Sequence, residues 1–154
     1  MGKEISNILL ETGTNEAEIL ELYIDEETYR GFYGVNVAKV IEIIPMPSKT
    51  IKPPDMTKSI VSGLFNHRDK IVVLIDLAKW LNKKRVEKRP PNVIITEFNN
   101  TVTAFLVSGV TRIHRVTWGN IKPLDGYMEN MSDTITGFIE LDNKLIFLLD
   151  LEKA

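Results

Sequence analysis

The chain contains two histidines, His67 and His114, and these are its only imidazoles for acid–base catalysis or metal binding. His67 lies in a polar segment of strand and turn residues, and His114 is flanked by Arg112 and Arg115. Neither histidine has carboxylates and further histidines nearby at the spacing of a metal site. We therefore expect structural roles for both histidines, and we expect no bound metal or cofactor.

Two aspartates, Asp76 and Asp150, follow apolar segments at equivalent places in the chain, and a pair of carboxylates can perform acid–base catalysis. The Leu and Lys that follow each aspartate favour a simpler role, in which the carboxylate caps a short helical turn by accepting backbone N–H groups. The sequence also has no cysteine nucleophile and lacks the motifs of dinucleotide-binding, P-loop and α/β-hydrolase sites. We therefore expect a protein that is not an enzyme.

These aspartates belong to two copies of one segment, GLFNHRDKIVVLIDLAK from Gly63 to Lys79 and GFIELDNKLIFLLDLEK from Gly137 to Lys153. An earlier pair of stretches matches as well, so the chain is a duplication with approximate halves at residues 15–81 and 92–154. Between them, residues 82–91 form a basic segment that ends in two prolines. Because no aromatic residues are interleaved with its charges, we interpret it as a solvated linker rather than a nucleic-acid site.

Each half follows the same plan of short strands. Residues 19–24 and 29–35 flank a polar turn, and residues 92–98 and 101–107 flank Asn99-Asn100, as expected for two hairpins. The closing strands IVVLID and LIFLLD are continuous apolar runs, which predicts burial on both faces. The pattern predicts an all-β fold of two five-stranded barrels.

Composition limits the kinds of partner. Hydrophobic residues make up 44% of the 154 residues, enough for a core, and the formal net charge is only −2. No strong field therefore attracts nucleic acid or a membrane surface. The absence of cysteine suits a reducing compartment, and the N-terminus lacks the long apolar stretch of a signal peptide or anchor. We expect a cytoplasmic protein without direct membrane insertion.

Several motifs, in the right order, carry a family resemblance. GVNVAKVIEII (34–44) followed by VSGLFNHRDKIVVLIDL (61–77) resembles the CheW family of bacterial chemotaxis coupling proteins. ILLETGTNEAEI (8–19), IITEFNNTV (94–102) and IHRVTWGNIKP (113–123) are similar to the N-terminal coupling domain of CheV. CheV proteins normally add a C-terminal receiver domain, and we expect none within residues 1–154. The sequence therefore fits a CheV-type coupling domain alone, a truncated CheV, or a CheW with CheV-like features.

The resemblance implies a single CheW-like domain at residues 1–154, with two SH3-like five-stranded β-barrels around a shared apolar core. It implies an adaptor without catalytic activity that couples chemoreceptor cytoplasmic tips to the CheA histidine kinase through the regulatory domain of the kinase. Other CheW-like domains are further expected partners, and the expected location is the cytoplasm, at membrane-bound receptor arrays.

The same resemblance implies protein-binding residues at matching positions. Those expected to contact receptor, kinase or array are Val40 and Glu42 on one strand, Gly63, Asn66, Arg68 and Ile71 on the repeated hairpin, and Val37, Val107 and Val110 along a groove between the barrels. For the valines, a place in the core is a serious alternative. The repeat counterpart of Arg68 is Asp142, so the duplication does not require a cation there, and arginine is well suited to anchor an interface.

The chain departs from the family pattern at two positions. Asp69 replaces the glycine after the arginine, and aspartate is among the better-tolerated residues at positive φ, so we expect the hairpin to form. Val73 replaces a proline, which predicts a more regular strand. Two rival functions remain: an SH3-like protein-binding scaffold outside chemotaxis, and a small-ligand-binding β-barrel with a polar pocket around His67 or His114.

Overall fold

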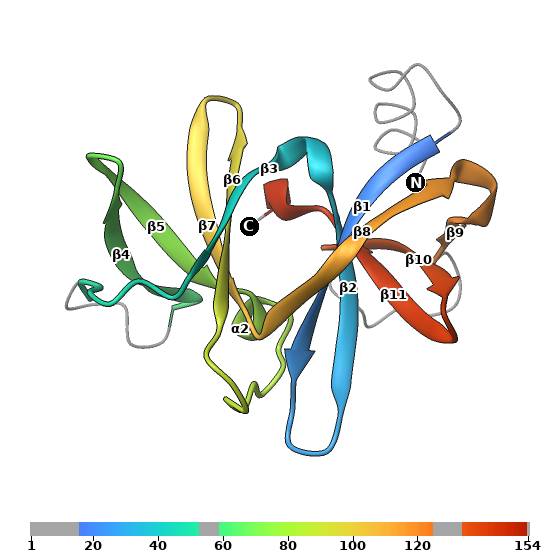
Figure 1. Ribbon diagram of the computed structural model, residues 1–154, viewed down its shortest axis with the longest axis horizontal. Helices are drawn as coiled ribbons and strands as arrows, with labels where there is room; N and C mark the ends of the chain where they lie inside the picture. Colours follow the sequence, from blue (N-terminus) through green and yellow to red (C-terminus); the bar gives the residue numbers. More distant parts are fainter. Residues whose placement is uncertain (1–15, 53–58, 125–133, 154) are drawn as a thin grey trace. The chain divides into compact units, whose positions relative to one another are not determined.

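The computed structural model describes residues 16–52, 59–124 and 134–153. The described residues form strands with short helical turns, arranged in two sheets (Figure 1). The expected all-β fold class is confirmed. The opening motif at residues 8–19 lies largely outside the described residues.

The chain divides into two compact units, each with its own apolar cluster. Unit 2 comprises Tyr23–Arg30 and Lys39–Val110. Its five-stranded sheet has the strand order β3-β6-β7-β5-β4. The strands are β3 (Val40–Pro45), β4 (Val61–His67), β5 (Lys70–Asp76), β6 (Asn92–Phe98) and β7 (Thr101–Val107), and the helical turn α2 (Leu77–Trp80) follows β5.

Unit 1 comprises Gly31–Ala38 together with the stretches that run up to Leu22 and onward from Thr111. Most of the six-stranded sheet, with the order β8-β1-β2-β11-β10-β9, belongs to this unit. The elements are β1 (Glu16–Asp25), β2 (Arg30–Asn36), η1 (Val37–Lys39), β8 (Gly109–Thr117), η2 (Trp118–Asn120), β9 (Lys122–Pro123), β10 (Ile135–Leu141), β11 (Lys144–Leu149) and η3 (Leu151–Lys153).

The units do not coincide with the halves of the duplication, because the halves exchange strands. In unit 2, β6 and β7 of the second half join β3, β4 and β5 of the first, and β5 runs parallel to β7. In the other sheet, β1 and β2 of the first half join β8 to β11 of the second, and β2 runs parallel to β11. Each sheet is therefore completed by strands from both copies of the repeat.

The closing strands are not buried on both faces, so that prediction was wrong. In β5, Ile71 and Val73 are exposed and alternate with the buried Val72 and Leu74, and Leu145 of β11 is also exposed. Val72 and Leu74 pack into the apolar cluster of unit 2, and Ile71 and Val73 alternate with them on the opposite face of the sheet. This outer face of the strand stays open.

Three two-residue turns close hairpins, and all six of their central residues adopt left-handed backbone conformations with φ between 51° and 64°. The residues are Arg68 and Asp69, Asn99 and Asn100, and Asp142 and Asn143. The predicted hairpin at Asn99-Asn100 is confirmed, and Asp69 tolerates a φ of 64° as expected.

The capping roles of the two aspartates are also confirmed. The Asp76 carboxylate accepts the N–H groups of Ala78 (3.1 Å) and Lys79 (3.4 Å) at the start of α2. The Asp150 carboxylate accepts the N–H of Glu152 (3.1 Å) in η3. Both carboxylates therefore satisfy backbone donors that a helical turn leaves without partners.

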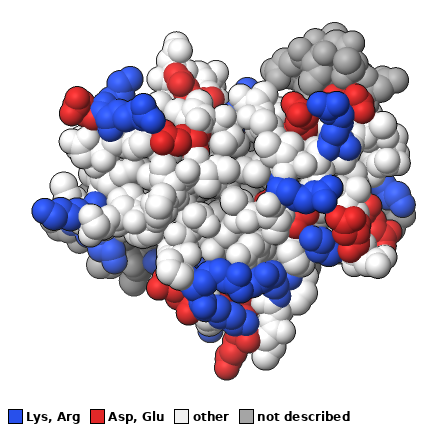
Figure 2. Space-filling model, in the orientation of Figure 1, with Lys and Arg blue, Asp and Glu red and all other residues white. Residues whose placement is uncertain are grey.

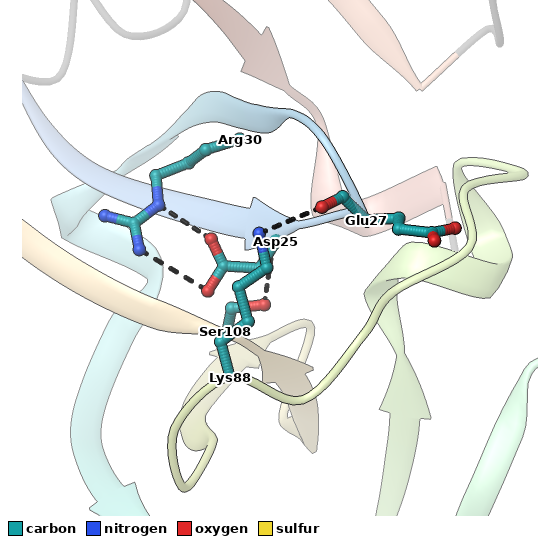
Figure 3. A network of polar contacts seen from close by, with 5 residues as sticks. All are labelled: Asp25, Glu27, Arg30, Lys88 and Ser108. Atoms are coloured by element: carbon teal, nitrogen blue, oxygen red, sulfur yellow. Dashed lines mark hydrogen bonds and ion pairs between the residues drawn. The ribbon is translucent and has the colours of Figure 1, made fainter.

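Most residues of the basic segment 82–91 are exposed, and two hydrogen bonds also attach the segment to the β1–β2 hairpin. The Val86 N–H donates to the Asp25 carbonyl (2.8 Å), and Lys88 Nζ donates to the Glu27 carbonyl (3.3 Å; Figure 3). Lys and Arg side chains gather over this segment (Figure 2). These attachments have no signal in the sequence, because their acceptors are backbone carbonyl groups.

Asp25, whose carbonyl accepts the hydrogen bond from Val86, has two further polar contacts. Its buried carboxylate accepts a 2.7 Å hydrogen bond from Arg30 Nε, and its N–H donates to the Ser108 hydroxyl (2.8 Å; Figure 3). The Arg30 guanidinium also lies over the Tyr23 ring, 4.0 Å from its centroid.

No helix within the described ranges is long and apolar enough to span a membrane.

Candidate protein-binding site

Eight of the nine expected binding residues lie in unit 2, and Val37 lies in unit 1. Within unit 2, the turn between β4 and β5 brings several of them together. Asn66 and Ile71 are directly opposite each other across the hairpin, and Arg68 occupies the turn itself. Acidic and basic side chains lie together at this tip (Figure 2).

Glu42, His67 and Arg68 form a polar cluster, which we call the tip triad. Arg68 Nη2 lies 3.2 Å from Glu42 Oε1, and His67 Nε2 lies 3.0 Å from the same oxygen. Hydrogen bonds from Arg68 and then from His67 hold the pKa of Glu42 below its ordinary value. Glu42 comes from β3 and the other two from the β4–β5 hairpin, so the triad joins the two edge strands of the sheet.

The backbone of Arg68 is unusual for its residue type. Its φ of 51° lies in the left-handed region, where Gly, Asn and Asp are favoured and arginine is uncommon. The repeat counterpart, Asp142, has the same φ with a suitable side chain. Arg68 thus occupies a position that the local backbone does not favour, as is typical of functional positions.

An apolar surface, which we call the hairpin face, extends from the tip along the outer side of the hairpin. It comprises Ile51, Leu64, Asn66, Ile71 and Val73. Paired residues share a face of a sheet, and Ile51 pairs with Leu64, which pairs with Val73. Ile51 and Ile71 are 63% and 62% exposed, and such contiguous exposed aliphatic side chains are typical of binding surfaces.

Two expected binding residues, Val107 and Gly63, are buried. Val107 is fully buried because it lies near the end of the central strand β7, so its side chain is not available to a partner. Gly63 is buried beside a β-bulge, where an added Cβ would lie 3.1 Å from the Ile51 carbonyl oxygen. The counterpart Gly137 is similarly crowded by the Lys122 carbonyl oxygen at 2.7 Å, which explains the glycine in both repeats.

The remaining valines are partly exposed. Val40 begins β3 and is separated from Glu42 by a register irregularity, and Val110 lies near the start of β8. Val37 begins η1. None of the three has the exposure of Ile71, so they contribute less accessible surface.

His114 belongs to a second cluster, the buried triad, in unit 1. His114 Nε2 lies 2.6 Å from Glu21 Oε1, and Lys144 Nζ lies 2.8 Å from Glu21 Oε2. Burial by itself raises the pKa of Glu21, but hydrogen bonds from Lys144, Thr111 and His114 outweigh burial and lower it. Among the residues that the structure describes, no group of three His, Asp or Glu is arranged to hold a metal ion.

Sequence reasoning missed three members of the hairpin face, Ile51, Leu64 and Val73, and the role of His67. The run IVVLID contains apolar residues at every position, so it does not reveal which of them point outward. Ile51 follows a proline-containing loop, and its pairing with β4 has no sequence signal. The contact of His67 with Glu42 spans 25 residues and joins β4 to β3, two strands that are not neighbours in the sheet.

Comparison with known proteins gives one consistent result. The family model described as CheW-like domain matches residues 18–154. The chain is 41% identical over 129 residues to chemotaxis protein CheV3 of Helicobacter pylori, an alignment that covers 80% of this chain and 41% of that protein. It is 28% identical over 138 residues to chemotaxis protein CheW of Thermotoga maritima, covering 90% and 87%.

Two further comparisons concern length and fold. Chemotaxis protein CheV2 of Helicobacter pylori is 26% identical over 151 residues, and 48% of it is covered, so the chain spans less than half the length of either CheV protein. The crystal structure of the scaffolding protein TtCheW from Thermoanaerobacter tengcongensis matches with a TM-score of 0.74 and 22% identity, covering 88% of this chain and 84% of that one. The latter similarity establishes the fold alone.

Proposed function

The chain belongs to the CheW-like domain family, and we propose that it is a non-enzymatic adaptor that couples chemoreceptor cytoplasmic tips to the CheA histidine kinase. Membership in a family of chemotaxis scaffold proteins supports this role. The proposed location is the cytoplasmic side of receptor arrays, where other CheW-like domains are additional partners. An adaptor of this kind acts by favouring particular receptor–kinase arrangements through its differential affinity for them.

The hairpin face is the observation that carries the proposal. Ile71 and Ile51 expose aliphatic surface, and Arg68 adds a cation at the tip of the same hairpin. An apolar patch bordered by a well-oriented arginine is a common composition for the centre of a protein interface. We therefore propose that the hairpin face and Arg68 bind the kinase regulatory domain or the receptor tip.

The direct test measures binding of the chain to the isolated regulatory domain of the cognate kinase and, separately, to a receptor cytoplasmic fragment. Isothermal titration calorimetry at tens of micromolar protein suits contacts of roughly 10⁻⁵ M. The variant Ile71→Ser should weaken binding to at least one partner about tenfold, because it removes an exposed apolar contact. Leu145→Ser is the matched control, since Leu145 is the repeat counterpart and is also exposed.

Binding that Ile71→Ser weakens and Leu145→Ser leaves intact would support both the adaptor role and this face. Equal loss of binding in the two variants would contradict the assignment of the binding surface to the hairpin face of unit 2. No binding by the unaltered chain to either partner would contradict the proposed function itself. Circular dichroism of each variant confirms that the fold is retained.

A further inference from the structure

The ring nitrogen Nε2 of His67 faces two groups with opposite requirements. It lies 3.0 Å from Glu42 Oε1 and 3.3 Å from Arg68 Nε. An ionised carboxylate can accept hydrogen bonds but not donate them, and a guanidinium can donate but not accept. A single nitrogen either carries a proton or offers a lone pair. The two contacts of His67 therefore cannot both be favourable at the same time.

The tautomer and the protonation state of His67 together decide between these contacts. A neutral ring with its proton on Nε2 donates to Glu42 and offers no acceptor to Arg68. A neutral ring with its proton on Nδ1 accepts from Arg68 and presents a lone pair to Glu42. A protonated ring donates to Glu42, partly neutralises that carboxylate and places a positive charge beside the guanidinium. Arg68 then loses the His67 nitrogen as an acceptor and shares the Glu42 carboxylate with the protonated His67 ring. Its side chain is therefore held less strongly within the chain.

We propose that His67 is a proton-sensitive latch, which on protonation releases Arg68 from the tip triad and makes it available to an acidic group on the binding partner. The inference rests on the proposed function, because it concerns regulation of the same surface. Arg68 is suited to such exchange, since its side chain is 75% exposed and only its Nε–Nη2 edge has contacts among the described residues. Its remaining edge can already face a partner carboxylate.

The surroundings of His67 support this direction of change. Glu42 faces it from β3, Arg68 and Asp69 are in the adjoining turn, and Lys70 is directly opposite it across the hairpin. The lowered pKa of Glu42 keeps that carboxylate ionised throughout the range in which histidines titrate. Histidine is the residue type that can gain a charge near neutral pH, and a proton on the His67 ring adds positive charge next to Arg68.

The first experiment uses the unbound chain, so its outcome does not depend on any partner. We would record the NMR signal of Arg68 Nε–H and its heteronuclear relaxation at pH values from about 8 to about 5.5, the range of histidine titration. The inference expects Arg68 to become more mobile as His67 is protonated. His67→Gln, which retains a donor and an acceptor but does not titrate, should abolish the change.

The second experiment measures partner affinity over the same pH range. Acidification should strengthen binding about two- to fivefold, the size expected for one exposed charge interaction, and His67→Gln should remove this dependence. Arg68 mobility that does not follow His67 titration would overturn the latch even if the partner binds well. Absence of partner binding at every pH would instead overturn the proposed function, and the NMR titration would still decide the latch.

Discussion

The two units each contain a glutamate, a histidine and a cation in contact, yet the two clusters differ in burial. In the buried triad, Glu21 is fully buried and His114 is 5% exposed. In the tip triad, the Glu42 side chain is 31% exposed and that of Arg68 is 75% exposed. The same residue types therefore lie in different surroundings: we expect the buried triad to be sensitive to the loss of one member, whereas the tip triad leaves its charges exposed to solvent.

The clusters are not copies of each other through the duplication. Lys144 of the buried triad corresponds to Lys70 in the first repeat, whereas Arg68 of the tip triad corresponds to Asp142. Glu21 and Lys144 are 123 residues apart and meet because strands of both halves form one sheet. Divergence after duplication has thus produced one stabilising cluster and one exposed cluster from different positions.

The largest expected effect is that of removing the central carboxylate of the buried triad. Glu21→Ala leaves His114 and Lys144 without their acceptor and should lower the free energy of unfolding by about 3 to 5 kcal/mol, as for other broken buried ion pairs. Urea unfolding followed by circular dichroism measures this change. Glu42→Ala is the matched control and should leave the unfolding midpoint nearly unchanged, because solvent screens an exposed cluster.

Equal destabilisation by the two alanine variants would contradict the contrast between the clusters. It would mean that the tip triad also stabilises the fold and that its exposure does not indicate a binding role. A small effect of Glu21→Ala alone would instead show that water replaces the lost carboxylate in the buried site.

The second prediction concerns acid. The folded state lowers the pKa of Glu21, so the stabilisation from its charge is complete above the ordinary glutamate range and is lost as pH falls through the lower pKa of the folded protein. The unaltered chain should therefore become less stable between about pH 5 and pH 2. Glu21→Gln should be less stable at neutral pH and lose less on acidification.

Urea midpoints of both proteins across this range provide the measurement. Parallel curves for the two proteins would show that other carboxylates, and not Glu21, cause the acid dependence. The tip triad includes a second glutamate with a lowered pKa, and Glu42→Gln tests whether that exposed group contributes.

The sequence predicted those parts of the fold that depend on neighbouring residues. The Asn99-Asn100 hairpin and the caps at Asp76 and Asp150 are local features, in which a side chain or turn acts within a few residues. Arg68 and Ile71 were located through the family resemblance, and the structure places them on accessible surface. Their binding role stays a prediction.

Other parts depend on long-range register, which a single sequence does not contain. An apolar run such as IVVLID fits a strand with either set of alternate residues inward, so the exposure of Ile71 was not foreseen from periodicity. Val107 was expected along a groove as a repeat-related or neighbouring apolar position, and it lies fully buried on the central strand β7. Both glutamate–histidine contacts likewise join strands that are distant in the sequence.

The smallest expected change in stability occurs at the tip, and it separates binding from folding most clearly. Arg68→Asn places a favoured residue at a φ of 51° and should raise the free energy of unfolding by on the order of 1 kcal/mol or leave it unchanged. The same variant removes the guanidinium and should weaken partner binding. The reciprocal change at the counterpart turn, Asp142→Arg, should slightly destabilise the chain, because arginine is uncommon at a φ of 51°. Urea unfolding and calorimetric binding of both variants test this pair of expectations. If Arg68→Asn destabilised the protein, Arg68 would contribute to the stability of the hairpin. The tip triad could then not be distinguished from the buried triad as a cluster that serves binding rather than stability.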